Sequence, residues 1–188
     1  MSLLVFLLFS LLFALTLLFI SLSAILTFLK TGVPPVSTKL AGLESILRQC
    51  QISSVDTFFD LGSGDGRVVF FVESLTGAHA VGFELAFWSH ILSCLKKKLK
   101  GSKARFVKSN FFERDWSEAT VVYAYLYPHL MGRVEEKFRT ECRRGSLAII
   151  RDFPFPNFQP RQIFKSNGVH KIYVYEILGE IHGRESRR

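Results

Sequence analysis

The stretch FFDLGSGDGRVVFFVESL, residues 58–75, predicts the fold of this chain. An apolar run ends in Asp60, glycines follow at positions 62, 64 and 66, and an apolar pattern with helical spacing then resumes. A strand, a glycine-rich turn and a helix in this order are typical of nucleotide-binding α/β domains, where ligands lie at the carboxyl ends of the strands. The stretch therefore raises the question of which ligand would lie beside Asp60 and Asp65.

The spacing of this turn argues against a dinucleotide. The dinucleotide fingerprint is G-x-G-x-x-G, which places a pyrophosphate on a helix N-terminus, whereas the turn here has G-x-G-x-G. The carboxylates of Asp60 and Asp65 would also repel a pyrophosphate. S-adenosylmethionine carries no phosphate, and both its ammonium group and its sulfonium favour nearby carboxylates. We therefore predict an S-adenosylmethionine site that comprises Asp60 and the turn Gly62, Ser63, Gly64, Asp65 and Gly66.

Two further polar residues follow predicted strands and extend this site. Glu84 ends the second strand, where an acid can accept hydrogen bonds from both ribose hydroxyls. Asn110 follows the third strand, where its amide can pair with the adenine edge. Structural roles are the alternatives: Asp65 as the cap of the following helix, Asp60 as a buried carboxylate that organises the turn, and Glu84 as an exposed strand-end charge.

Strands and helices alternate along the rest of the chain, which predicts an α/β fold with a parallel, doubly wound sheet. A helix over 40–50, capped by Ser37 or Thr38, precedes this sheet. The last two strands read as an antiparallel hairpin, so we predict a Rossmann-like seven-stranded methyltransferase sheet; the alternative is a plain Rossmann domain without the hairpin. Strands are expected over 56–61, 79–85, 104–110, 120–127, 145–153, 161–165 and 170–178, and helices over 67–75, 87–100 (amphipathic) and 129–142.

The N-terminal segment is a candidate membrane helix. Residues 3–29 contain no charged residue, proline or glycine, and about 20 such residues span a bilayer core. A cleaved signal peptide is the alternative, but it usually has a basic start and a shorter apolar core. Lys30, Lys39 and Arg48 follow the span, so the positive-inside rule places the C-terminal domain on the cytoplasmic side, or the matrix side in a mitochondrion.

The expected organisation is a transmembrane anchor at 1–30, a linker and capping helix at 31–50, a methyltransferase domain at 51–181 and a basic tail at 182–188. The formal net charge is +8, which suits an anionic membrane surface. The basic clusters 96–103 and 183–188 are not interleaved with aromatic residues, so we predict no nucleic-acid partner. Three unpatterned cysteines and five scattered histidines predict neither disulfides nor a metal site.

At these residues the chain resembles the membrane-anchored protein-lysine methyltransferases of the seven-β-strand class. That group includes the lysine methyltransferases of the ATP synthase c-subunit and of the adenine nucleotide translocase, with prokaryotic relatives. The resemblance is carried by the N-terminal span, VPPVSTK (33–39), DLGSGDGR (60–67), VGFEL (81–85) followed by Trp88, and RDFPFPNFQP (151–160). It implies methyl transfer from S-adenosylmethionine to a lysine of a membrane or membrane-proximal protein. The alternatives are a methyltransferase for a lipid or small hydrophobic substrate and a non-catalytic S-adenosylmethionine-binding scaffold.

The acceptor lysine must arrive as a neutral amine, and an aromatic, desolvating channel disfavours its ammonium form. Tyr125 and Tyr127 end the fourth strand, and Phe153 and Phe155 follow the fifth. We predict a substrate channel formed by Tyr127, Phe153 and Phe155, with Tyr125 and Asp152 as the catalytic candidates. Asp152 could hold the incoming ammonium or accept a proton. The aromatic residues could instead belong to the core or to a membrane-facing patch, and Asp152 could form an ion pair with Arg151 or cap a loop.

Overall fold

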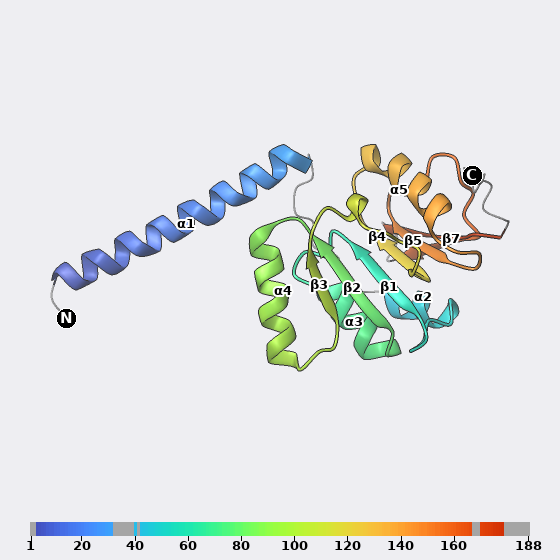
Figure 1. Cartoon of the computed structure of the whole chain (residues 1–188), viewed down its shortest axis with the longest axis horizontal. Coiled ribbons are helices and arrows are strands. Elements are labelled where there is room, and N and C mark those ends of the chain that lie inside the picture. The colour runs from blue at the N-terminus through green and yellow to red at the C-terminus, as the bar shows by residue number, and fades with distance from the viewer. Residues whose placement is uncertain (1–2, 32–39, 41, 167–169, 179–188) are drawn as a thin grey trace, which may run out of the picture.

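The computed structural model describes residues 3–31, 40, 42–166 and 170–178 (Figure 1). The predicted linker residues 32–39 and the basic tail 182–188 lie outside this described part. A long N-terminal helix, α1 (Leu3–Thr31), extends away from an α/β domain that contains the other elements. The expectation of an α/β domain preceded by one apolar helix is confirmed.

Within the described residues, seven strands form one sheet in the order β3-β2-β1-β4-β5-β7-β6. Strands β1 to β5 run parallel, and β7 is antiparallel to both β5 and β6. The predicted sheet with a C-terminal antiparallel hairpin is therefore confirmed. The strands are β1 (Thr57–Leu61), β2 (His79–Glu84), β3 (Arg105–Lys108), β4 (Val121–Ala124), β5 (Leu147–Arg151), β6 (Gln162–Ser166) and β7 (His170–Glu176).

Alternating side chains of the strands build two cores, one on each face of the sheet. Phe58 lies on the face that is covered by α2 (Leu43–Gln49) and α3 (Arg67–Thr76). Its neighbour Phe59 lies on the opposite face, which is covered by α5 (Pro128–Glu141). The carboxyl ends of the five parallel strands therefore meet at a single edge between these two layers, where ligands of such folds bind.

Most predicted boundaries lie within two residues of the structure, but two of them differ by three residues. The predicted fourth strand ends at Ala124 rather than at residue 127, because its pairing with β1 stops at Leu61, where the glycine turn begins. Tyr125 and Tyr127 consequently lie in the connection between β4 and α5. The predicted helix cap was also wrong: α2 begins at Leu43, and Gly42 is its N-cap with a φ of 84°. Ser37 and Thr38 lie outside the described residues.

Helix α4 (Phe87–Lys100) has the predicted bounds and the predicted amphipathic pattern, but its apolar face points away from the sheet. Ser93 is the residue of this helix that is buried. Ile91, Leu95 and Leu99 are all exposed. This orientation is unusual for a helix that packs on a sheet, because such helices normally bury their apolar stripe.

Candidate active site

The glycine turn follows β1 and is tied to the end of β2. Its three glycines, Gly62, Gly64 and Gly66, have φ values of 77°, 55° and 79°. Side-chain-bearing residues rarely adopt such angles, which explains the repeated glycines. The backbone N–H groups of Gly62 and Ser63 both donate to the Phe83 carbonyl at 2.9 Å. The turn is therefore fixed at the carboxyl edge of the sheet.

The turn has one packed side and one open side. A Cβ atom added at Gly66 would lie 2.6 Å from the Phe106 ring, so this glycine permits close packing. Ser63 also belongs to the packed side, since a Cβ atom at Gly82 would lie 2.6 Å from its hydroxyl oxygen. At Gly64, by contrast, a Cβ atom would meet no atom within 4 Å. The open space of the turn therefore lies over Gly64.

Glu84, at the end of β2, is held against this turn by backbone hydrogen bonds. Gly64 N–H donates to Glu84 Oε2 at 2.8 Å, and Ala86 N–H donates to Glu84 Oε1 at 2.6 Å. A carboxylate has about four lone-pair sites, so each oxygen keeps the capacity to accept another hydrogen bond. Glu84 thus presents a fixed, bidentate acceptor beside the open space over Gly64.

Asp60 is a buried acid at the end of β1, with only 3% of its surface exposed. Burial, followed by the nearby carboxylates of Glu84 and Asp65, raises the pKa of Asp60 to about 8. A positive charge placed beside Asp60 would favour its ionised form and reverse this shift. The buried acid is therefore suited to a cationic ligand.

Asp65 is engaged within the protein. Its carboxylate accepts hydrogen bonds from Arg67 Nε at 2.9 Å and from Lys96 Nζ at 2.6 Å. These partners, Arg67 first, hold the pKa of Asp65 well below its usual range, because they favour the ionised form. Asp65 also accepts a long hydrogen bond of 3.4 Å from the backbone N–H of Arg67 at the start of α3. Asp65 is thus held by ion pairs with Arg67 and Lys96, and the N-cap of α3 is Gly66 rather than Asp65.

Asn110 follows β3 at the predicted place, but its side chain makes local contacts. Its Oδ1 accepts from Phe112 N–H at 3.1 Å, and its Nδ2 donates to Glu113 Oε1 at 3.1 Å. Asn110 therefore caps the short 3₁₀-helix η1 (Phe111–Glu113). The preceding residue, Ser109, has a buried hydroxyl without a hydrogen-bond partner among the described residues. Ser109 was not predicted as a site residue. The signal for it would have been its place directly before Asn110, the predicted adenine contact.

These observations fit S-adenosylmethionine. The open space over Gly64 lies next to the fixed acceptor Glu84, and Asp60 is a buried acid that a cation would ionise. The backbone N–H of Ser109 donates to the Glu84 carbonyl at 3.1 Å, which places Ser109 beside Glu84. The buried Ser109 hydroxyl has no hydrogen-bond partner among the described residues, so it can bond to a ligand. Among the described residues, no group of three or more His, Cys, Asp or Glu side chains could hold a metal ion.

On the other side of the site, Asp152 connects the ends of β4, β5 and β7. Its Oδ2 lies 2.9 Å from His170 Nδ1, and its Oδ1 accepts from Lys171 N–H at 3.1 Å. The Tyr125 side chain is also hydrogen-bonded to Asp152, and burial followed by this bond raises the pKa of Tyr125. Arg151 Nε lies 4.0 Å from Asp152 Oδ2. Both catalytic candidates therefore belong to one hydrogen-bonded group.

The backbone of Asp152 is strained, with a φ of 64°. Such a conformation costs about 1–3 kcal/mol in a residue that has a side chain, and it persists where the surroundings enforce it. Here the Asp152 N–H donates to the Lys171 carbonyl at 2.8 Å, which extends the pairing of β5 with β7 by one residue. The strain thus aims the carboxylate at Tyr125 and His170. Sequence reasoning missed His170, because the pairing of β5 with β7 could not be aligned from the sequence.

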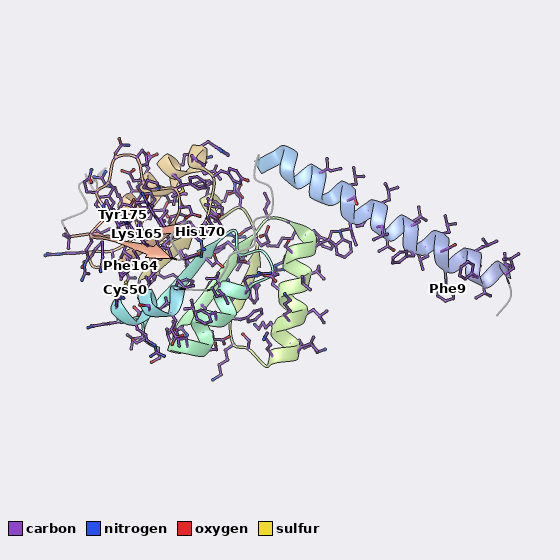
Figure 2. The ribbon with its side chains drawn as sticks, turned by 180° about the vertical axis from the view of Figure 1, so that it is seen from behind. Phe9, Cys50, Phe164, Lys165, His170 and Tyr175 are labelled. Atoms are coloured by element: carbon purple, nitrogen blue, oxygen red, sulfur yellow. The ribbon has the colours of Figure 1, made fainter. Side chains whose placement is uncertain are left out.

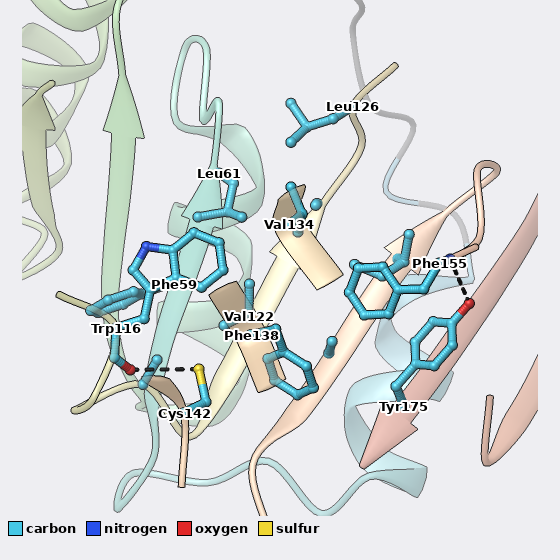
Figure 3. Packing of buried hydrophobic residues seen from close by; sticks show 14 of the residues in the cluster. Phe59, Leu61, Trp116, Val122, Leu126, Val134, Phe138, Cys142, Phe155 and Tyr175 are labelled. Atoms are coloured by element: carbon cyan, nitrogen blue, oxygen red, sulfur yellow. Dashed lines mark hydrogen bonds between the residues drawn. The ribbon is translucent and has the colours of Figure 1, made fainter. Parts of the chain in front are cut away.

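The predicted channel residues separate into two groups. The rings of Tyr127 and Phe153 stack at a centroid distance of 6.4 Å with an interplanar angle of 19°, and both are half-buried. Phe155 lies instead in the core, where it is 4% exposed and packs 4.5 Å from the Tyr175 ring (Figure 3). Its N–H donates to the Tyr175 hydroxyl at 2.9 Å. The prediction of Phe155 as a channel residue is therefore not supported, because its ring is buried in the core, whereas Phe153 is half-buried at the border of the same core.

A parallel sheet that ends in an antiparallel hairpin, with its glycine turn after β1, is the architecture of the class I S-adenosylmethionine-dependent methyltransferases. A solved structure with this fold is an RNA methyltransferase from Salinibacter ruber in complex with S-adenosyl-L-homocysteine. It has a TM-score of 0.73 and 28% sequence identity, and the match covers 78% of this chain and 96% of that chain. The chain belongs to the family of the ANTKMT methyltransferase domain, whose model matches residues 60–162. It is an S-adenosylmethionine-dependent methyltransferase.

Two relatives illustrate the range of this family. A protein-lysine N-methyltransferase from Saccharolobus islandicus is 30% identical over 154 residues, which cover 79% of this chain and 95% of that protein. The lysine N-methyltransferase of the ATP synthase c-subunit from Xenopus laevis is 31% identical over 147 residues, which cover 77% of this chain. The match spans 62% of the frog protein, so this chain corresponds to only part of it.

Proposed function

We propose that this enzyme is a protein-lysine N-methyltransferase that acts on a membrane or membrane-proximal protein. The observation that carries the proposal is the match to the Saccharolobus protein-lysine N-methyltransferase over 95% of its length. The Xenopus relative is named for the c-subunit of ATP synthase, and a mouse relative at 26% identity is named for the adenine nucleotide translocase. Relatives with different membrane-protein substrates favour a membrane-protein acceptor, without selecting one of them.

The N-terminal helix supports the same proposal. Within the described residues, α1 is the one helix that is long and apolar enough to cross a membrane, over Leu3–Leu22, and none of that segment is buried against the domain. We propose that α1 is an uncleaved single-pass anchor. The basic residues Lys30, Lys39 and Arg48 that follow it favour a catalytic domain on the cytoplasmic or matrix side.

The cofactor-binding role is proposed for the edge formed by β1, β2 and β3. Glu84 would accept hydrogen bonds from ribose hydroxyls, Asp60 would balance a positive charge, and Gly64 would leave room for the ligand. Bound S-adenosylmethionine supplies a methyl group that is activated by the sulfonium. The residues of the turn need only hold this group in line with the acceptor, since positioning is the main requirement of such a transfer.

The stacked pair Tyr127–Phe153 is proposed as the wall along which the lysine side chain enters. A lysine ammonium in water has a pKa near 10.4, and an apolar wall lowers it by disfavouring the charged form. The ring faces also fit the aliphatic stem of a lysine. The acceptor nitrogen would therefore reach the site with its lone pair free for attack on the methyl carbon.

Methylation of an amine leaves one proton to be removed, and we propose that the Asp152 group receives it. With Nδ1 of His170 donating to the Asp152 carboxylate, Nε2 of the ring carries the lone pair. Asp152 would thus hold the imidazole in the tautomer that accepts a proton at Nε2. Tyr125, on the same carboxylate, would position the incoming amine.

The test is to incubate the purified full chain with radiolabelled S-adenosylmethionine and membranes from a strain that lacks it. Mass spectrometry of the labelled fraction then identifies the modified group. Methyl groups on a lysine of a membrane protein are expected. Label in extracted lipid would support the alternative substrate class, and label in RNA would match the named activity of the Salinibacter protein.

A variant of the cofactor site gives the control for this experiment. Glu84→Gln replaces one acceptor oxygen by an amide that clashes with the Gly64 or Ala86 N–H. It should therefore lose label from every fraction. Glu73→Gln is the matched control. Glu73 also accepts a hydrogen bond from a backbone N–H, that of Lys103, but Lys103 lies before the amino end of β3 and therefore away from the proposed site. If neither variant changes the labelling, the assigned cofactor site is wrong.

A further inference from the structure

Helix α4 carries an exposed apolar face that nothing else in the described chain covers. The members of this face follow helical spacing and belong to α4, apart from Leu85 just before it: Leu85, Phe87, Ile91, Leu92, Leu95 and Leu99. Leu95 is 53% exposed and Leu99 is 77% exposed. Contiguous exposed apolar residues of this kind mark contact sites, whereas scattered ones need no explanation. We call this set the α4 stripe.

The membrane helix α1 touches the α4 region without covering it. The rings of Phe19 and Trp88 meet edge to face at a centroid distance of 5.8 Å. Phe19 lies in the last turn of the candidate span Leu3–Leu22, so this contact is close to one end of the span. The α4 stripe remains exposed with α1 in place. Figures 1 and 2 show α1 leaving the domain beside α4, with the two helices running in different directions.

Positive charges border the α4 stripe. Lys98 lies seven residues after Ile91 and three after Leu95, so it shares their face of the helix. At the other end, Lys108 Nζ lies 4.8 Å from the centre of the Phe87 ring. Lys98 and Lys108 are both exposed, and neither forms a salt bridge with an acidic side chain of the described residues. An amphipathic helix that is rich in lysine and has one apolar face is typical of helices that lie in a membrane interface.

We propose that α4 is a second membrane-contacting element, which lies along an anionic lipid surface with its apolar stripe in the interface. The lipid surface is favoured over another protein because one apolar medium would cover both the α4 stripe and the exposed α1. The lysines at the stripe ends complement anionic headgroups, where each is worth on the order of a few-fold in binding. Leu85 and Phe87 follow Glu84, so this contact would hold the carboxyl edge of the sheet close to the membrane.

This proposal goes beyond the identity of the acceptor, but it uses the α1 anchor proposed above. The test places a nitroxide spin label at residue 95 of the full chain, by Leu95→Cys in a Cys50→Ser, Cys94→Ser background. Cys142 is fully buried and can remain. The matched control is Val55→Cys, because Val55 is an apolar residue that is 83% exposed just before the amino end of β1. The samples are lipid nanodiscs with phosphatidylcholine alone or with added phosphatidylglycerol.

The measurement is the accessibility of each label to dissolved oxygen and to an aqueous nickel chelate. In nanodiscs with phosphatidylglycerol, the label at 95 should be several-fold more accessible to oxygen than to nickel, and the label at 55 should stay accessible to nickel. Lys98→Glu with Lys108→Glu should weaken the lipid signal at residue 95. The signal should also fall in phosphatidylcholine alone.

Three results would overturn the proposal. A label at 95 that remains open to nickel in every lipid shows an undocked helix. A label shielded from both reagents in all samples shows a protein cover, and spin–spin coupling between two labelled chains would identify a second copy. If the oxygen accessibility of the label at 95 is unchanged by charge reversal and by lipid composition, α4 does not recognise an anionic surface. Carbonate extraction reports the α1 anchor separately, so an anchored chain with a water-exposed residue 95 counts against α4 alone.

Discussion

His170 Nδ1 lies 2.9 Å from Asp152 Oδ2, across the pairing of β5 with β7. This contact brings together residues that are 18 positions apart in sequence. It exists because Asp152 adopts a left-handed backbone conformation, which keeps its N–H paired with Lys171 while its carboxylate points to the histidine. The strained residue Asp152 therefore holds the His170 ring at the edge of the sheet where the methyl acceptor is proposed to arrive.

If His170 accepts the proton of the methylated amine, His170→Asn should impair the chemical step. The asparagine amide can still donate to Asp152, but it carries no titratable nitrogen. We expect kcat to fall about 10²-fold, the usual contribution of a general base. Cofactor affinity should stay unchanged, as measured by calorimetry. A variant with the kcat of the native enzyme would exclude the relay.

The raised pKa of Asp60, about 8, predicts a proton linkage to cofactor binding. Below pH 8 the free enzyme holds Asp60 protonated, and a cationic ligand favours the ionised form, so binding should release a proton. Affinity should therefore rise with pH up to about 8, by at most tenfold for each pH unit. Calorimetry in buffers of different ionisation enthalpy measures the proton directly, and Asp60→Asn should abolish its release.

The same group affects the stability of the free enzyme with a known sign. Its pKa of about 8 in the folded state lies above the value near 3.9 in an unfolded chain, so the folded state binds the proton more tightly. Stability should consequently decrease as the pH rises from about 4 through 8, and less so in Asp60→Asn. Chemical denaturation at three pH values tests this. An Asp60→Asn variant with the unchanged pH slope would contradict it.

The sequence was sufficient for the fold because its signals are local. Gly62, Gly64 and Gly66 indicate a turn with positive φ angles, and Glu84 marks the end of a strand. What it could not give are the contacts that depend on packing between distant segments. The engagement of Asp65 by Lys96 needs the position of α4, and the pairing of Asp152 with His170 needs the register of β7. The spacing of α4 likewise predicted one apolar face, but its direction is set by how the helix sits on the sheet.

The two sides of the glycine turn predict opposite behaviour for two similar substitutions. Both Gly64 and Gly66 have positive φ, so alanine costs about 1 kcal/mol at either position. Gly66→Ala also places a Cβ atom 2.6 Å from Phe106, and should lower the free energy of unfolding by several kcal/mol. Gly64→Ala meets open space, so it should fold well but bind S-adenosylmethionine at least tenfold more weakly. Thermal unfolding and calorimetry separate the two. If both variants lose the same affinity for S-adenosylmethionine and have similar stability, the space over Gly64 does not hold the ligand.

Phe153 and Phe155 allow the proposed acceptor wall to be distinguished from the core by two matched substitutions. Phe153 stacks on Tyr127 at the edge, and Phe155 is buried against Tyr175. Phe153→Ala should raise KM for a lysine-bearing acceptor about tenfold or more, because the wall that desolvates the amine is lost, while cofactor affinity stays unchanged and stability falls less than in Phe155→Ala. Phe155→Ala should instead destabilise the fold by about 3–5 kcal/mol, as deletion of a buried ring does. If Phe153→Ala lowers the melting temperature as much as Phe155→Ala and leaves the acceptor KM unaltered, Phe153 belongs to the core and the lysine enters elsewhere.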